Sequence, residues 1–300
     1  MTDTIFVTGA SGHLGRAVID HLLGSRGVAP ARLVAGTRSP EKLADLAARG
    51  VTIRKADFDD SAGLEKAFAG VDTVLIVSTD AIDGSGTRLR QHKAAVAAAV
   101  KAGAKRLAYT SLPLAESSRV LFAPDHFGTE EAVKATGLPY LIFRNGWYHE
   151  NLMLALPRAL ATGQWHTSAG QGRTSYVARD DIAAAIAAAI TEPATDSTTY
   201  TLTGNETLTN AEVAALAAEI VGKTTQVVHV TDEQLAEGMK AAGVPEPAIP
   251  TLVSFDTATR HGDLGLVTDD VEKLSGRKPR PLAEFLKANK AALAGGAHAA

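Results

Sequence analysis

Short apolar segments alternate with longer amphipathic segments through the first half of the chain. The short segments are apolar along nearly their whole length, as expected of parallel strands that helices cover on both faces. We expect strands at residues 4–8, 32–36, 51–54, 73–77, 106–110 and 139–143. We expect helices at about 13–24, 40–48, 61–69, 87–102 and 126–136. This alternation predicts an α/β fold with a doubly wound parallel sheet of the Rossmann type.

The pattern changes after Arg144, where the regular alternation ends. A strand and a helix at 175–190 and a strand at 198–202 are expected to return to the first domain. Beyond them we expect helices at 209–221, 231–242, 248–262 and 281–293 and a strand at 225–230. We therefore predict a Rossmann domain of residues 1–146 with about 175–203, and a smaller, mostly helical substrate or lid domain of about 147–174 with 204–294. Residues 295–300 are expected to form a frayed tail.

Composition narrows the class of protein. The formal net charge is −3 with no basic run, so no nucleic-acid partner is expected. The chain has no cysteine, which excludes disulfides, thiolate catalysis and cysteine metal sites. No apolar run reaches about 18 residues and no charged-then-apolar leader precedes Ile5, so we expect a soluble cytoplasmic protein with no membrane partner. The sequence leaves the oligomeric state open, with a homodimer as a fair default for a soluble enzyme.

Three glycines spaced three apart follow the first predicted strand, at Gly9, Gly12 and Gly15. A nucleotide pyrophosphate needs such a loop: the first glycine permits the tight turn, the second lets the backbone approach the phosphates, and the third lets the helix pack close to the sheet. The N–H groups and the dipole of the helix N-terminus then face the anion. The spacing resembles that of short-chain dehydrogenases/reductases. A glycine-rich turn that binds nothing is the plain alternative.

The residues that end the next strands indicate which nucleotide is bound. NAD-binding folds usually carry an acidic residue after the second strand, which holds the ribose 2′-hydroxyl. Here that position is Arg38, with Lys42 one turn further on, so a 2′-phosphate is favoured and the cofactor is expected to be NADP(H). A solvated surface arginine is the alternative. Asp57 and Phe58, after the third strand, are candidates for the adenine edge and ring, or else a loop acid and a core aromatic.

The catalytic pair of typical short-chain reductases is absent. Those enzymes carry Tyr-x-x-x-Lys, in which the lysine lowers the pKa of the tyrosine and the tyrosine transfers the substrate proton. None of the five tyrosines has a lysine four residues on, and the expected helix has His126 and Glu130 at the two positions.

The missing pair limits the acceptors that can be reduced. Hydride transfer to a ketone gives an alkoxide whose conjugate acid has a pKa near that of water, about 16, so a ketone needs an acid catalyst. A hydroquinone anion, with a pKa near that of tyrosine at about 10, can take its proton from solvent. Quinones, enones and cationic dyes therefore fit this site.

Three segments together resemble the NmrA-like atypical short-chain reductases, and within that family the quinone reductases. They are Tyr109-Thr110-Ser111-Leu112, His126 with Glu130, and Arg144-Asn145-Gly146-Trp147-Tyr148-His149-Glu150-Asn151. The resemblance implies an NADPH-binding cleft and direct hydride transfer to a quinone or similar planar electrophile, with no flavin. The cofactor-binding candidates are Gly9, Ser11, Gly12, His13, Leu14, Gly15, Arg38, Asp57, Phe58, Ser78 and Thr79.

Four residues are candidates for catalysis, Ser111, His126, Asn145 and Tyr148, while Trp147 and Tyr148 are candidates for stacking on the acceptor. Each has a structural alternative. Ser111 could cap a turn, His126 could be a partly exposed histidine at a helix start, and Asn145 could form a turn. The two aromatic side chains could pack in a core. The nine histidines include no i, i+4 pair, so no metal site is expected.

Two other functions stay open at this point. One is an NmrA-like regulator that senses NADP(H) without turning it over, and the other is a reductase of a dye or an enone. The missing Tyr–Lys pair is compatible with all three functions. The choice of acceptor depends on loops whose shape the sequence does not give.

Overall fold

The computed structural model describes residues 3–82, 85–193 and 196–295. The chain divides into two compact units, which are described separately. The first comprises residues 1–115, 124–145 and 182–201, and the second comprises 116–123, 146–181 and 202–300. Of the tail expected at 295–300, only Gly295 lies within the described residues, as the last residue of a helix.

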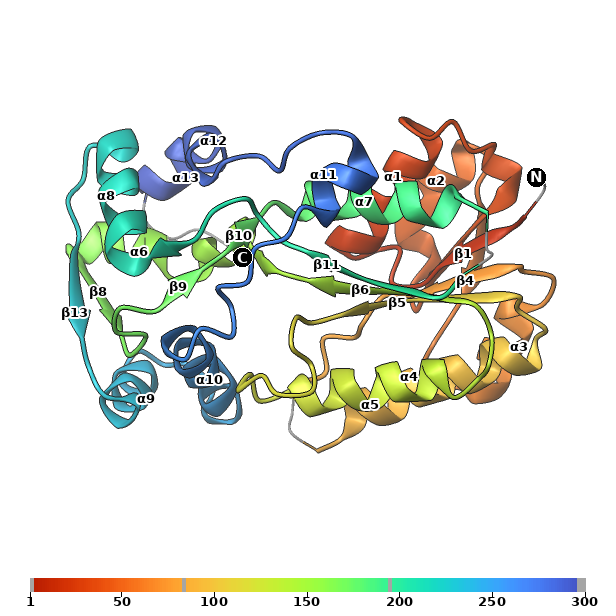
Figure 1. Cartoon of the computed structure of the whole chain (residues 1–300), viewed down its shortest axis with the longest axis horizontal. Coiled ribbons are helices and arrows are strands. Elements are labelled where there is room, and N and C mark those ends of the chain that lie inside the picture. The colour runs from red at the N-terminus through yellow and green to blue at the C-terminus, as the bar shows by residue number, and fades with distance from the viewer. Residues whose placement is uncertain (1–2, 83–84, 194–195, 296–300) are drawn as a thin grey trace. The chain divides into compact units, whose positions relative to one another are not determined.

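The first unit is built on a seven-stranded sheet in the order β11-β6-β5-β4-β1-β2-β3 (Figure 1). Its strands are β1 (Ile5–Val7), β2 (Leu33–Thr37), β3 (Thr52–Lys55), β4 (Thr73–Ile76), β5 (Arg106–Ser111), β6 (Tyr140–Asn145) and β11 (Thr198–Leu202). The pairs from β3 across to β6 are parallel, which confirms the predicted doubly wound α/β fold. The strand order reverses between β1 and β4. Ligands of such sheets bind outside the carboxyl ends of the strands at this switch point.

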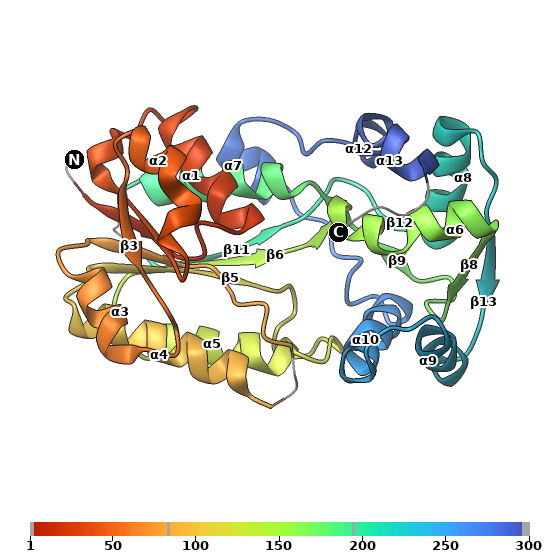
Figure 2. The ribbon, with the colours of Figure 1, turned by 180° about the vertical axis from the view of Figure 1, so that it is seen from behind.

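Helices cover both faces of this sheet. Figures 1 and 2 show α1, α2 and α7 on one face and α3, α4 and α5 on the other. Their bounds are α1 (His13–Leu23), α2 (Ala44–Ala48), α3 (Ser61–Phe68), α4 (Thr87–Lys101), α5 (Ala123–Lys134) and α7 (Arg179–Thr191). Two 3₁₀ turns, η1 (Pro30–Arg32) and η2 (Pro40–Leu43), precede β2 and α2. The helix expected at 40–48 is thus part 3₁₀, and the helix expected to begin at 126 begins at Ala123.

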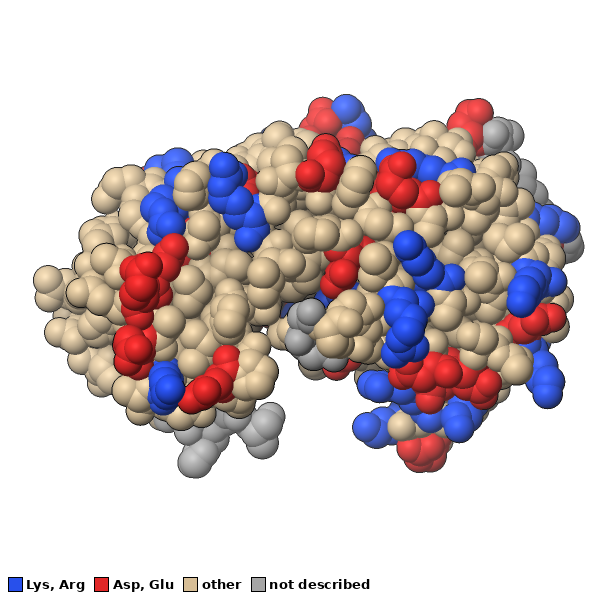
Figure 3. All heavy atoms as spheres, turned by 90° about the horizontal axis from the view of Figure 1, so that it is seen from below, with Lys and Arg blue, Asp and Glu red and all other residues tan. Residues whose placement is uncertain are grey.

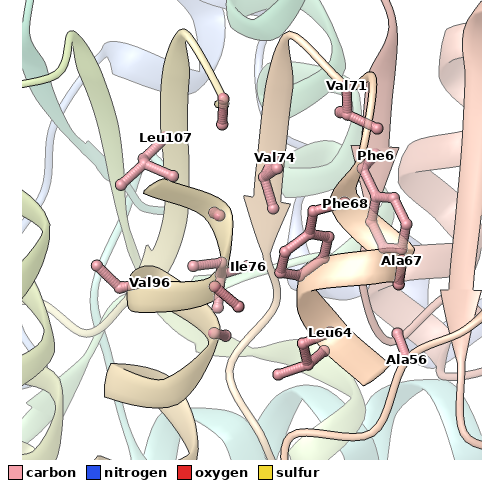
Figure 4. Close-up of a cluster of buried hydrophobic side chains, with 14 of the residues drawn as sticks. Phe6, Ala56, Leu64, Ala67, Phe68, Val71, Val74, Ile76, Val96 and Leu107 are labelled. Carbon is pink, nitrogen blue, oxygen red and sulfur yellow. The ribbon is translucent and has the colours of Figure 1, made fainter. Parts of the chain in front are cut away.

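A cluster of buried apolar side chains fills the space between the sheet and helices α3 and α4 (Figure 4). The rings of Phe6 on β1 and Phe68 on α3 meet edge to face with their centroids 4.8 Å apart. Such a pair contributes about 0.5–1.5 kcal/mol beyond the area that it buries. Gly36 on β2 makes room for it, because a Cβ there would lie 2.2 Å from Phe6 Cε1. This packing fixes β1 beside β2, and the ends of these two strands carry the candidate nucleotide site.

The second unit contains two-stranded sheets and short helices. Its strand pairs are β7 (Trp147–Tyr148) with β10 (Tyr176–Val177), β9 (Arg173–Thr174) with β12 (Leu208–Thr209), and β8 (Gln164–Thr167) with β13 (Gln226–His229). Its helices include α6 (Leu156–Thr162), α8 (Asn210–Val221), α9 (Asp232–Ala241), α10 (Ile249–Arg260), α11 (Asp270–Ser275), α12 (Leu282–Ala288) and α13 (Lys290–Gly295), with 3₁₀ turns η3 (His149–Leu154) and η4 (Glu246–Ala248). Capping boxes begin α8 at Thr209 and α9 at Thr231.

Three details of this half differ from the sequence-based expectation. The strand near 175 pairs, as β10, with β7 of the second unit and not with the large sheet. The single helix expected at 281–293 is two helices that are interrupted at Asn289. Helix α11 was not predicted, because its six residues are too short to show an apolar stripe.

Candidate active site

The loop between β1 and α1 has the geometry of an anion cradle. Gly9 takes a left-handed φ of +61°, and Gly12 is the N-cap of α1, its N–H donating to Gly9 O at 2.9 Å. A Cβ on Gly15 would lie 2.5 Å from Gly9 O, so the close contact of helix and strand requires glycine there. Gly9, Ser11, Gly12 and His13 are exposed, whereas Leu14 is buried. The two glycines have no side chains, so the backbone of this loop is exposed at the N-terminus of α1. The side chain of Leu14 points into the core instead.

The end of β2 lies next to this loop. Ser11 Oγ is 2.8 Å from Thr37 Oγ1, and Thr37 Oγ1 accepts the N–H of Ser39 at 3.1 Å. Arg38 between them is exposed. The backbone on both sides of Arg38 is thus held by Thr37, whose hydroxyl also contacts Ser11 of the glycine loop. The role of Arg38 as the ligand of a ribose 2′-phosphate stays a prediction.

Asp57 and Phe58, shortly after β3, lie in different surroundings. Asp57 is half-buried, and its Oδ1 accepts the N–H of Asp59 at 3.1 Å, which closes a local turn. Phe58 is only 8% exposed and belongs to the apolar cluster beneath the sheet. The ring of Phe58 is therefore a core side chain, which agrees with the structural alternative, and a contact of this ring with adenine stays a prediction.

The backbone that leaves β4 borders the glycine loop. Ser78 and Thr79 are half-buried, and a Cβ on Gly9 would lie 3.5 Å from Val77 Cβ. Both segments follow the strands that flank the switch point. Their position agrees with the expectation that Ser78 and Thr79 lie beside a bound dinucleotide, which stays a prediction.

His126 lies in a buried polar cluster with residues of α4 and β5. It is 2% exposed, its Nδ1 is 2.7 Å from the hydroxyl of Tyr109, and Arg88 Nη2 is 3.2 Å from its Nε2. Because a guanidinium only donates, Nε2 accepts and Nδ1 carries the proton. Burial, followed by the charge of Arg88 and the neighbouring His92, holds the pKa of His126 well below its usual value. His126 is therefore a neutral buried imidazole, and the alternative of a partly exposed histidine is wrong.

Tyr109 stands between two histidines in this cluster. Its hydroxyl is also 3.2 Å from Nδ1 of His92, and the two rings meet edge to face at 5.4 Å. Burial raises the pKa of Tyr109 above its usual value. A buried phenol with a raised pKa does not behave as the activated tyrosine of typical short-chain reductases, whose pKa is lowered by lysine.

Ser111 ends β5 and is tied to Glu130. The Ser111 hydroxyl donates to Glu130 Oε1 at 2.6 Å, and Arg144 donates to both oxygens of the same carboxylate at 2.9 and 2.8 Å. Ser111 is 5% exposed, and Glu130 is completely buried. Since its proton is committed to Glu130, Ser111 can serve a ligand only as an acceptor.

Of the remaining candidates, Asn145 belongs to the first unit, and Trp147 and Tyr148 belong to the second. Asn145 is buried at the end of β6, whereas Trp147 and Tyr148 on β7 are half-buried. Within the second unit, the Trp147 ring meets Phe255 edge-on at 4.6 Å, and the guanidinium carbon of Arg179 lies 4.9 Å from the Tyr148 ring centroid. Both rings are thus in contact with protein within the second unit, and their stacking on an acceptor stays a prediction.

His92 and Thr129 complete the cluster around Tyr109 and were not among the residues predicted from the sequence. His92 Nδ1 is 3.0 Å from Thr129 Oγ1, and both residues are fully buried. A signal was present in α4: Arg88 and His92 are polar residues at i and i+4 that continue into the buried stripe of Ala95, Val96 and Ala99. Polar residues inside an apolar stripe indicate a built polar cluster.

Among the described residues, no three His, Asp or Glu side chains converge as the ligands of a metal ion would. Along the same parts of the chain, no helix combines the length and the apolar character that a membrane span needs. On the face drawn in Figure 3, basic and acidic side chains are interspersed rather than gathered by sign.

Comparison with known proteins adds a family and several relatives. The sequence model of the NmrA-like family matches residues 1–286. Quinone oxidoreductase 2 of Escherichia coli is 35% identical over 280 residues, which cover 93% of this chain and 96% of that protein. The crystal structure of the E. coli NADPH-dependent quinone oxidoreductase complexed with NADPH has a TM-score of 0.90 at 34% identity and covers 95% of this chain and 99% of that one. The Citrobacter triphenylmethane reductase complexed with NADP(H) has a TM-score of 0.89 at 35% identity, again covering 95% and 99%.

Proposed function

The chain belongs to the NmrA-like family, and we propose that it is an NADPH-dependent reductase that passes a hydride directly to a quinone or similar planar electrophile. Its relatives include oxidoreductases whose structures are known with NADPH or NADP(H). The observation that carries the proposal is one pair of positions. Where a typical short-chain reductase has a catalytic tyrosine and lysine, this chain has a buried neutral His126 and a Glu130 that is ion-paired with Arg144.

The residues of the glycine loop fit a dinucleotide. The backbone of Gly9, Ser11 and Gly12 would face the pyrophosphate at the N-terminus of α1, since no side chain projects from the two glycines. Arg38 would hold the 2′-phosphate through charge-assisted hydrogen bonds. A carboxylate at that position would repel the phosphate. When bound, NADPH supplies the hydride. We expect no flavin, because direct transfer needs none.

The proposal limits the acceptor to a molecule that stabilises its own negative charge. His126 is buried and neutral, and the Ser111 proton is held by Glu130, so neither is placed to protonate an alkoxide. A ketone would therefore react slowly, whereas a quinone leaves as a hydroquinone anion that solvent can protonate. Ser111 Oγ, as an acceptor, is the contact in the first unit that we propose for the planar acceptor. Stacking of Trp147 and Tyr148 on an acceptor stays a prediction from the sequence.

Dyes remain within the same proposal as alternative acceptors. The similarity to the triphenylmethane reductase equals the similarity to the quinone oxidoreductase, at 35% and 34% identity. A cationic triphenylmethane dye also meets the chemical requirement, because hydride addition neutralises it and no proton is needed.

The test is NADPH oxidation by the purified protein against a panel of acceptors. The panel contains a benzoquinone, a naphthoquinone, a triphenylmethane dye and a plain ketone, and NADPH binding is measured separately by calorimetry. We expect turnover of the quinones, with or without the dye, and little or none of the ketone. Tight NADPH binding without turnover of any acceptor would replace the proposal with a regulator that senses NADP(H). Equal turnover of the ketone would contradict the argument from the missing pair.

A further inference from the structure

Three consecutive backbone N–H groups after β4 are each held by a buried side chain. Val77 N–H donates to Thr8 Oγ1 at 2.8 Å, Ser78 N–H donates to Thr110 Oγ1 at 2.8 Å, and Thr79 N–H donates to His92 Nε2 at 3.0 Å. The acceptors come from three separate places, the end of β1, β5 and α4. All three are at most 1% exposed. We call residues 77–79 with these three side chains the amide clamp.

The amide clamp replaces sheet hydrogen bonds where the sheet ends. Beyond Ile76 the chain leaves β4, so its N–H groups lose their ladder partners and need others. Side-chain acceptors from the neighbouring elements supply them. The path of residues 77–79 is thereby fixed by directional bonds at each residue, and not only by packing.

The order of the strands places the amide clamp beside one particular half of a bound dinucleotide. Arg38 at the end of β2 is where the adenosine phosphate would be held, and the glycine loop at the end of β1 faces the pyrophosphate. The next strand in the sheet is β4. The nicotinamide half would therefore extend over the carboxyl end of β4, where the amide clamp lies.

His92 differs from the two threonines, because an imidazole accepts at Nε2 only in one form. Thr129 Oγ1 gives its own proton to Asp125 O at 2.7 Å, so it accepts from His92 Nδ1, 3.0 Å away. The proton of His92 is thus on Nδ1, and Nε2 is free to accept from Thr79. Burial and the charge of Arg88 lower the pKa of His92 to about 3, which keeps this neutral form at physiological pH.

We propose that His92 is a positioning residue of the reaction: through the N–H of Thr79 it fixes the backbone against which the nicotinamide is held for hydride transfer. This inference rests on the proposed function. A loss of His92 would let residues 77–79 move, and a misplacement of about 1 Å costs up to roughly a hundredfold in rate. The adenosine half, held on β1 and β2, would be unaffected.

The test compares His92→Phe with His92→Gln. Phenylalanine fills the site but cannot accept a hydrogen bond, whereas the side-chain oxygen of glutamine can reach the place of Nε2. For His92→Phe we expect kcat with a benzoquinone to fall by about ten- to a hundredfold, with unchanged affinity for adenosine 2′,5′-bisphosphate, which probes the adenosine half alone. His92→Gln is expected to recover most of the rate. Lys93→Ala, at the exposed neighbour on α4, is the matched control and should match the wild type.

Several results would overturn the inference. They are a His92→Phe rate within about twofold of the wild type, an equal loss in both His92 variants, or a parallel loss of affinity for the bisphosphate. A wild type that binds no NADPH would overturn the proposed function and the inference with it, so the two failures are distinct. If His92→Phe does not fold, ¹⁵N NMR of the histidines in the wild type gives the decision: the Nδ1–H form of His92 is expected, and the Nε2–H form would overturn the inference.

Discussion

Glu130 on α5 and Arg144 on β6 form an ion pair through two hydrogen bonds of 2.9 and 2.8 Å. The Glu130 side chain is completely buried, while 17% of the Arg144 side chain is exposed. We propose that Glu130 occupies the position at which typical short-chain reductases carry the lysine that lowers the pKa of the catalytic tyrosine. The Glu130 carboxylate is paired with Arg144, lies 3.7 Å from Lys134 Nζ and accepts the hydroxyl proton of Ser111, so it organises the end of β5.

Removal of one partner of this pair is expected to destabilise the fold. Arg144→Met would remove two hydrogen-bond donors from a buried carboxylate and leave it only Lys134, whose Nζ lies 3.7 Å from Glu130 Oε2, so we expect a loss of about 3 kcal/mol of unfolding free energy. Urea denaturation at neutral pH measures the loss. Lys240→Met is the matched control, because its pair with Glu246 has side chains 60% and 70% exposed and should shift the midpoint little. Equal effects of the two substitutions would show that the buried pair is not needed for stability.

The assignment of the 2′-phosphate to Arg38 is tested by cofactor preference. Arg38→Ala is expected to weaken NADPH binding by about ten- to a hundredfold, as the loss of charge-assisted hydrogen bonds implies. NADH, which lacks the phosphate, should be affected little. Calorimetry with both cofactors gives the comparison. Lys101→Ala is the control, because Lys101 is an exposed residue at the C-terminal end of α4. Equal losses for NADPH and NADH would remove the assignment.

Replacement of Gly12 and of Gly15 by alanine is expected to affect different properties, namely NADPH affinity at Gly12 and stability at Gly15. A Cβ on Gly15 would lie 2.5 Å from Gly9 O and 3.0 Å from Thr8 O, so Gly15→Ala should lower the thermal unfolding temperature. A Cβ on exposed Gly12 would lie 3.3 Å from Gly9 O, which a small shift accommodates. Gly12→Ala should therefore keep the fold but lose roughly tenfold or more in NADPH affinity, because the methyl group keeps the phosphate away. Thermal unfolding and calorimetry on both variants separate the two effects. An unchanged affinity in Gly12→Ala would argue against the cradle.

Acid should destabilise the protein through its buried histidines. The pKa of His92 is lowered to about 3 in the folded protein, against about 6.5 in an unfolded chain. Below the unfolded pKa the unfolded chain therefore binds a proton that the native protein rejects, so stability falls as the pH falls. From pH 7 to pH 5 this one group accounts for a loss of about 2 kcal/mol. His126 acts in the same direction.

His92→Phe isolates this contribution. Its unfolding free energy, measured by urea denaturation at pH 7 and pH 5, should fall less steeply with acid than that of the wild type. The same pH dependence in both proteins would show that His92 is protonated in the native state.

The large elements could be predicted from the sequence because each has a local signal. Continuous apolar runs indicate buried parallel strands, and the spacing of Gly9, Gly12 and Gly15 indicates the βα turn. The pairing of β10 with β7 and the short helix α11 could not be predicted. A strand of two residues has no periodicity, and its partner is chosen by tertiary contacts.

The candidate site could be predicted only in part, for a similar reason. Motifs locate residues at strand ends, but burial decides what those residues can do. Phe58 is a core residue because the apolar cluster reaches the end of β3, and Ser111 has its proton committed because Glu130 is brought against it from α5. The role of His92 depends on Thr79 and Thr129, which are far from each other in sequence and meet only in the fold.

The central claim is that this chain passes a hydride from NADPH directly to a planar acceptor. A single-turnover experiment tests it most directly: the purified protein is loaded with one equivalent of NADPH, deuterated at the transferred position, and mixed anaerobically with a benzoquinone while the NADPH absorbance is followed. The account predicts rapid oxidation of the bound NADPH, slowed by a primary isotope effect, in a protein without flavin absorbance. Bound NADPH that neither a quinone nor a triphenylmethane dye oxidises would contradict it.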